Sequence, residues 1–131
     1  MPDEAALARG WFLKADSDVN TAERMVESDG PYDTACFHAQ QAVEKYLKGL
    51  VAFHGVPFHR THNLEERQQL GEALPAWPLA GLDLAELSSY AIEVRYDVEF
   101  WPDRWTAQEA LRMASKVRYR ALDSVPEGAR P

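Results

Sequence analysis

One segment of the chain, residues 32–54, limits the possible folds more than any other. Its apolar side chains recur at steps of three and four residues, the spacing that places them on one face of an α-helix. They are Ala35, Ala39, Ala42, Val43, Tyr46, Leu47, Leu50 and Val51. Gly55-Val56-Pro57 follows and predicts the end of the helix, because glycine and proline interrupt helical backbone. The segment therefore predicts a long amphipathic helix with a wide apolar face.

The same spacing predicts three more helices, over residues 4–28, 83–96 and 106–125, and a capping pattern predicts a short one over residues 64–74. In the first, the predicted apolar stripe is Leu7, Trp11, Ala15, Val19, Ala22 and Val26. The charged residues between them are expected to face water; they are Lys14, Asp16, Asp18, Glu23 and Arg24. No segment alternates apolar and polar residues as a strand does, so the fold class is predicted to be all-α.

Helix ends are predicted from capping patterns. Asp29-Gly30-Pro31 stops the first helix, because glycine suits the left-handed cap and proline cannot continue the helix. Asn63 with Glu66, and Thr106 with Glu109, have the spacing of a capping box and predict the starts of the third and fifth helices.

Length and composition predict one soluble domain. A chain of 131 residues has room for one hydrophobic core, which we place in residues 1–125, with 126–131 as a flexible tail. The net charge of −7 argues against broad attachment to duplex DNA or to an anionic membrane. The single cysteine, Cys36, excludes an internal disulfide and a cysteine-rich zinc site. Since no secretory signal or membrane-length apolar run is present, we expect a cytoplasmic protein.

The second predicted helix also carries a family resemblance. Its sequence from Tyr32 to Leu50, YDTACFHAQQAVEKYLKGL, resembles the signature helix of the HEPN family, named for nucleotide binding in higher eukaryotes and prokaryotes. Further features match in the same order: Trp11, Ala15 and Ala22, then Thr61-His62-Asn63-Leu64, then Arg95-Tyr96. Together they span residues 8 to 122.

The resemblance implies an antiparallel up-and-down bundle of about five helices that pairs as a symmetric homodimer. Many prokaryotic members act beside a minimal nucleotidyltransferase in a two-part toxin–antitoxin module, and many are metal-independent ribonucleases. The nuclease members carry an arginine followed, after about four to six residues, by a histidine. Here no histidine follows Arg95 at that spacing, which puts the usual nuclease mechanism in doubt.

Residues on two helices are candidates for an anion site. His38, Gln41, Lys45 and Lys48 follow steps of three and four and share one stripe, whose ammonium groups could contact phosphates while Gln41 contacts a base or sugar. The alternative is a solvated or dimer-facing stripe in which Glu44 pairs with Lys48.

On the fourth helix, the resemblance places the active-site arginine near Arg95. Its guanidinium could grip a phosphate, or bridge to Asp97, Glu99 or a second subunit. Tyr96 could stack on a base, or simply pack.

Other chemistry-bearing residues have plainer interpretations. The aromatic connector of Phe100, Trp101, Arg104 and Trp105 could bind single-stranded nucleic acid, although packing on the bundle or on a partner is favoured. His54, His59 and His62 match no zinc spacing, so no metal is expected, although His62 could replace the missing base. Cys36 is expected to be buried, not nucleophilic.

Three hypotheses follow. The first is a nucleotide-binding or regulatory module that requires no cofactor and acts as a homodimer with a nucleotidyltransferase partner. The second is a ribonuclease toxin that uses Arg95 with Tyr96, His38 or His62. The third is a structural adaptor with an empty cleft.

Overall fold

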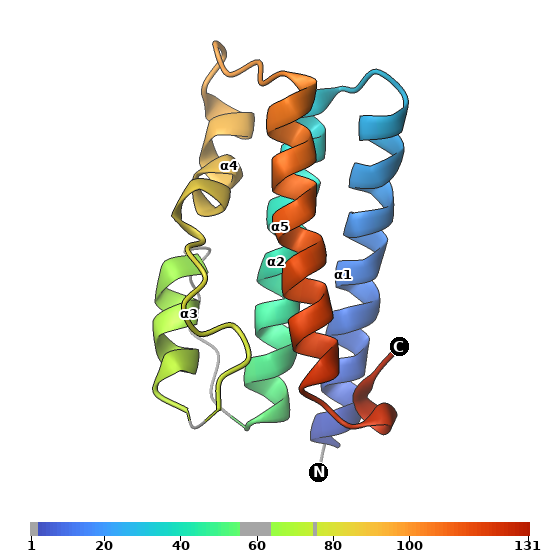
Figure 1. The fold of residues 1–131 in the computed structure, drawn as a ribbon, viewed down its shortest axis with the longest axis vertical. Coiled ribbons are helices and arrows are strands. Elements are labelled where there is room, and N and C mark those ends of the chain that lie inside the picture. The colour runs from blue at the N-terminus through green and yellow to red at the C-terminus, as the bar shows by residue number, and fades with distance from the viewer. Residues whose placement is uncertain (1–2, 56–63, 75) are drawn as a thin grey trace.

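The residues that the structure describes form a bundle of five α-helices and one short 3₁₀ helix (Figure 1). A computed structural model describes residues 3–55, 64–74 and 76–131. The helices are α1 (Glu4–Glu27), α2 (Tyr32–Phe53), α3 (Leu64–Glu72), α4 (Ala85–Tyr96), α5 (Arg104–Asp123) and the 3₁₀ helix η1 (Glu127–Ala129). No β-strand occurs in these ranges. The all-α prediction is confirmed.

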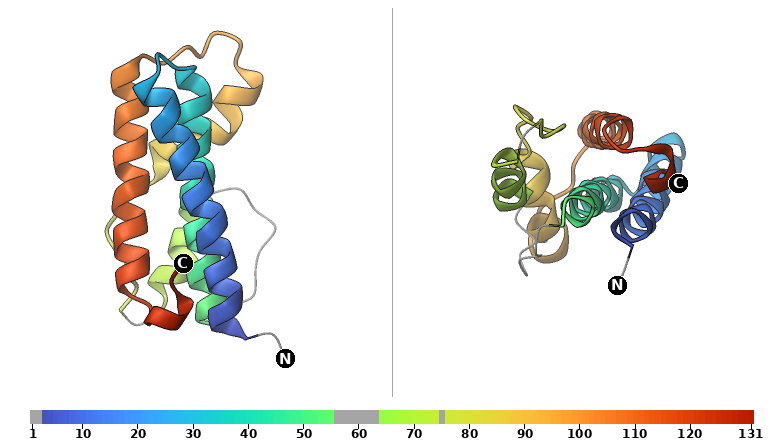
Figure 2. Two further views of the ribbon diagram at one scale, coloured as in Figure 1. Left: turned by 90° about the vertical axis from the view of Figure 1, so that its right-hand side faces the viewer. Right: turned by 90° about the horizontal axis from the view of Figure 1, so that it is seen from below.

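Helix α2 is the centre of the bundle. It packs against α1, α5, α4 and α3, and the end view in Figure 2 shows it surrounded by them. Helices α1 and α4 run in one direction and α2 and α5 in the other (Figure 1). The wide apolar face predicted for α2 is buried among these neighbours, with Tyr46, Leu47 and Leu50 fully inaccessible to solvent.

The buried face of α1 differs from the predicted one at its N-terminal half. Ala8 and Phe12 are buried there, whereas Leu7 is 45% exposed and Trp11 is half-buried. Phe12 is drawn inward because Gly49 on α2 has no side chain: a Cβ added at Gly49 would lie 2.5 Å from the Phe12 ring. The helix spacing was therefore predicted correctly, but the stripe is displaced by one residue over its first two turns.

The start of α5 corrects one predicted cap. Helix α5 begins at Arg104, and its N-cap is Asp103, not Thr106. The Asp103 carboxylate accepts hydrogen bonds of 2.8 Å from both the backbone N–H and the hydroxyl of Thr106. Helix α4 begins at Ala85, whose N–H donates to Asp83 at 3.0 Å. Asn63, the predicted cap of α3, lies outside the described residues.

Hydrogen bonds hold two further segments in place: the turn after α1 and the C-terminal end of the chain. The predicted stop after α1 is present, with Gly30 at φ +95° and its N–H bonded to the Met25 carbonyl at 2.7 Å. At the other end of the chain, where a flexible tail was predicted, η1 packs beside α1: Ala129 is buried and the Arg130 carbonyl accepts from Arg9 Nε at 3.0 Å. None of the helices in the described ranges is long and apolar enough to cross a membrane.

Candidate anion-binding site

The four residues predicted to share a stripe of α2 lie on a partly open side of that helix. We call His38, Gln41, Lys45 and Lys48 the α2 strip; each is half-buried, while α2 residues such as Ala39, Ala42 and Tyr46 are fully covered. The residues that contact the strip come from α1 and from α2 itself, and Arg95 of α4 approaches Phe37, the residue before His38.

Asp18 of α1 pairs with two residues of the α2 strip, His38 and Lys45. Its carboxylate is 2.8 Å from Nδ1 of His38 and 2.5 Å from Nζ of Lys45. Asp18 was predicted to face water, and this is wrong: it is buried. Because it lies three residues after Ala15 and four before Ala22, it stands on the face of α1 that packs against α2. That position in the stripe is the sequence signal that could have identified it.

Glu44 of α2 partly balances the positive charge of Lys48, the last residue of the strip. The predicted pair of Glu44 and Lys48 is present at 3.8 Å, and Glu44 is also 3.6 Å from Nη2 of Arg67 on α3. The Lys48 ammonium lies 4.8 Å from the centre of the Trp11 ring, within range of a cation–π contact. Gln41 donates to Gln40 at 2.7 Å and to Glu44 at 3.4 Å. Both lysines of the strip therefore already have carboxylate partners.

Arg95 is different, because its guanidinium has no carboxylate partner among the residues the structure describes. Nε donates to the Ala91 carbonyl at 2.7 Å. Its guanidinium carbon, Cζ, lies 6.0 Å from the centre of the Phe37 ring and 5.5 Å from the centre of the Tyr96 ring. The alternative bridges from Arg95 to Asp97 or Glu99 within the chain are not formed, and Asp97 instead accepts from the Glu99 backbone N–H. The terminal nitrogens of Arg95 are thus available to an anion, beside a tyrosine that is 72% exposed.

Exposed apolar side chains recur from the last turns of α4, through the connector, to the start of α5. We call Ile92, Tyr96, Val98, Trp101 and Trp105 the connector patch. Packing on the bundle or on a partner is the predicted role of this segment, and within this chain Phe100 packs on the bundle, with its ring centre 5.5 Å from that of Tyr90. Trp101 is 75% exposed and Trp105 is 66% exposed. Within a single chain, therefore, these two rings do not pack on the hydrophobic core.

Several other candidates contribute no chemistry in the described part of the chain. Cys36 is buried, and burial raises the pKa of its thiol to about 12, so it is a poor nucleophile. His54 packs edge-on against Phe53. His59 and His62 lie outside the described residues. Within those residues, no group of three metal-ligating side chains is close enough to hold an ion.

The comparisons with known proteins agree with this architecture. The crystal structure of TT1696 from Thermus thermophilus is similar, with a TM-score of 0.75 and 29% sequence identity over 92% of this chain and 99% of that one. No curated protein matches the sequence. The family model described as HEPN domain matches residues 8–123. The match covers most of the bundle, from α1 to the end of α5, and the chain therefore belongs to the HEPN domain family.

Proposed function

We propose that this HEPN-domain chain is a nucleotide-binding regulatory module whose phosphate-binding residue is Arg95. The observation that carries the proposal is an arginine without a carboxylate partner in the described ranges, which donates to the Ala91 carbonyl and lies within 6.0 Å of two aromatic ring centres. A planar guanidinium held in this way can present two N–H groups to a phosphate. Its orientation is set before the ligand arrives, which lowers the entropic cost of binding.

The neighbouring residues suit the rest of a nucleotide. Tyr96 is exposed and adjacent, so its ring can stack on a base. The α2 strip begins beside Phe37, the ring under Arg95. Lys45 is paired with Asp18, and Lys48 with Glu44. Either lysine can therefore contact a phosphate only if it gives up its carboxylate partner or contacts both groups at once. We therefore assign them a secondary role and give Arg95 the main one.

The connector patch supports the proposal that two copies pair. Exposed tryptophan and tyrosine side chains gathered on one segment are typical of protein interfaces. Tyr96 belongs to the patch and neighbours Arg95, so pairing through the patch would place the two arginines near the interface. A minimal nucleotidyltransferase is the second partner we propose, on the ground of family membership.

The test is a titration of the purified protein with a panel of adenine and guanine nucleotides, followed by calorimetry. Saturable binding is expected. Arg95→Ala should weaken it by about tenfold or more, the effect of losing a charge-assisted hydrogen bond. Arg24→Ala removes a cation from α1, which lies on the opposite side of α2 from α4 (Figure 2), and should bind as the wild type does. If no nucleotide binds, or if both variants lose affinity equally, the proposal is wrong and the adaptor hypothesis gains support.

A second candidate function, metal-independent RNA cleavage, is favoured by one observation on α2. With Nδ1 of His38 bonded to Asp18, Nε2 is directed away from the carboxylate, and the side chain is 28% exposed. A histidine oriented by a carboxylate is a suitable proton acceptor. Nε2 would take the proton of a ribose 2′-hydroxyl as its oxygen bonds to phosphorus, while the 5′-oxygen leaves with a proton from water.

Cleavage is tested by incubating the protein with total RNA in the presence of EDTA. His38→Ala and Arg95→Ala should both abolish any cleavage seen, while His54→Gln, a change at the far end of α2, should leave it intact. Cleavage that persists in His38→Ala would rule out this role for His38. Pairing with the product of a neighbouring nucleotidyltransferase gene is tested separately, by co-purification of the two proteins.

A further inference from the structure

Positive charge is concentrated on one helix of an otherwise acidic protein. Helix α5 contains five basic residues, Arg104, Arg112, Lys116, Arg118 and Arg120, and two acidic ones, Glu109 and Asp123. Its formal charge is therefore +3, whereas the whole chain carries −7, which leaves −10 on the other residues. The net charge of the whole chain does not show this uneven distribution of charge. Counting the basic and acidic residues of each predicted helix does.

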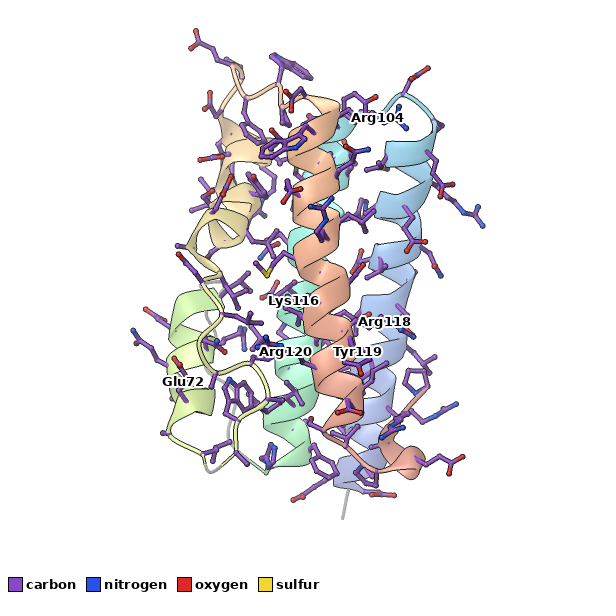
Figure 3. All side chains as sticks on the ribbon, in the orientation of Figure 1. Glu72, Arg104, Lys116, Arg118, Tyr119 and Arg120 are labelled. Atoms are coloured by element: carbon purple, nitrogen blue, oxygen red, sulfur yellow. The ribbon has the colours of Figure 1, made fainter. Side chains whose placement is uncertain are left out.

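Several of these cations are not used inside the fold. Arg112 pairs with Glu109 at 2.6 Å, and Arg118 pairs with Asp16 of α1 at 2.8 Å. Arg104, Lys116 and Arg120 have no ion-pair partner in residues 3–55, 64–74 and 76–131. Figure 3 shows Lys116 and Arg120 along the side of α5 that faces α3, and Arg118 toward α1.

An exposed aromatic ring stands among the cations. Tyr119 is 72% exposed and lies three residues after Lys116 and one before Arg120. Figure 3 shows it on the outer side of α5. Lys116 and Arg120 are one helical turn apart, about 6 Å along the axis, and Arg112 is one turn before Lys116. Cations repeated at this spacing beside an accessible ring resemble the surfaces that follow a single nucleic-acid strand.

We propose that the face of α5 formed by Arg112, Lys116, Tyr119 and Arg120 binds the backbone of single-stranded nucleic acid, with Tyr119 stacked on a base. A single strand is favoured over a duplex for two reasons. The basic ridge is only one helix wide, and the strongly negative remainder of the protein repels a long polyanion that would reach beyond it. An exposed ring can stack only on an unpaired base. The face is separate from Arg95, and the proposal does not rest on nucleotide binding there.

The test measures fluorescence anisotropy of a labelled twelve-nucleotide oligouridine, and of the matching DNA oligomer, over a series of salt concentrations. Lys116→Ala combined with Arg120→Ala should weaken binding at least tenfold at low salt. It should also reduce the slope of log affinity against log salt by about 1.4, or about 0.7 for each phosphate that is no longer neutralised. Tyr119→Ala should weaken binding about fivefold or more without changing that slope.

The matched control is Lys14→Ala combined with Arg24→Ala, which removes two cations from α1 and should bind like the wild type. The proposal is overturned by the absence of saturable binding at low salt, or by an equal loss of affinity in this control. It is also overturned if Arg95→Ala abolishes binding while the α5 double variant binds normally. Equal binding of polyglutamate, with no effect of Tyr119→Ala, would overturn it in favour of an acidic protein partner.

Discussion

Gly49 shows how one missing side chain sets the packing of α1 on α2. A Cβ at this position would lie 2.5 Å from Phe12 Cε1, whereas a Cβ at Gly10 of α1 would meet nothing within 4 Å. We expect Gly49→Ala to lower the free energy of unfolding by about 1–3 kcal/mol through overpacking. Gly10→Ala should raise it by about 0.5–1 kcal/mol, because alanine favours the helix. Urea denaturation of both variants measures this, and a rise in both midpoints would contradict it.

Asp18 is the second position where one side chain has a large effect. It is buried and receives two donors from α2, His38 and Lys45. Asp18→Ala leaves both without their acceptor and should cost about 1–3 kcal/mol of stability. In a double-mutant cycle, Asp18→Ala and Lys45→Ala should show a coupling energy of about 0.5–3 kcal/mol. Strictly additive effects would show that the 2.5 Å contact contributes nothing.

Asp103 caps the N-terminus of α5, and its capping hydrogen bonds depend on the ionisation of its carboxyl group. Hydrogen bonds from Thr106 lower the pKa of Asp103 below its ordinary value of 3.8. A carboxyl whose pKa is lower in the folded state adds stability above its unfolded pKa, and that stability is lost as the pH falls through the folded pKa. Asp103→Asn keeps a capping acceptor but cannot titrate.

The melting temperature of the wild type should therefore fall more steeply below about pH 4 than that of Asp103→Asn. Thermal melts followed by circular dichroism from neutral to acid pH measure the difference. Parallel curves for the two proteins would show that the cap does not contribute to the acid sensitivity of α5.

At the level of the assembled protein, the connector patch predicts the oligomeric state. If two copies pair through Trp101 and Trp105, the molecular mass in solution should be twice 14.8 kDa. Trp101→Ser combined with Trp105→Ser should shift the equilibrium to the monomer, because aromatic anchors supply much of the energy of an interface. Tyr119→Ser, which removes a similarly exposed ring from α5, should leave the mass unchanged. Sedimentation equilibrium tests this, and a monomeric wild type would refute the pairing.

The sequence by itself determined the number, order and approximate limits of the helices, because these follow from apolar spacing and from glycine and proline within one segment. It also determined the HEPN family, through the residues of α2. The tertiary structure alone decided which charges are available. Asp18 and Lys45 are 27 positions apart, and their pairing depends on how α1 lies against α2. The same packing buries Phe12 in place of Trp11 and, within the described residues, leaves Arg95 and three cations of α5 without carboxylate partners. A local pattern cannot predict these outcomes, since each depends on contacts between helices that are distant in the chain.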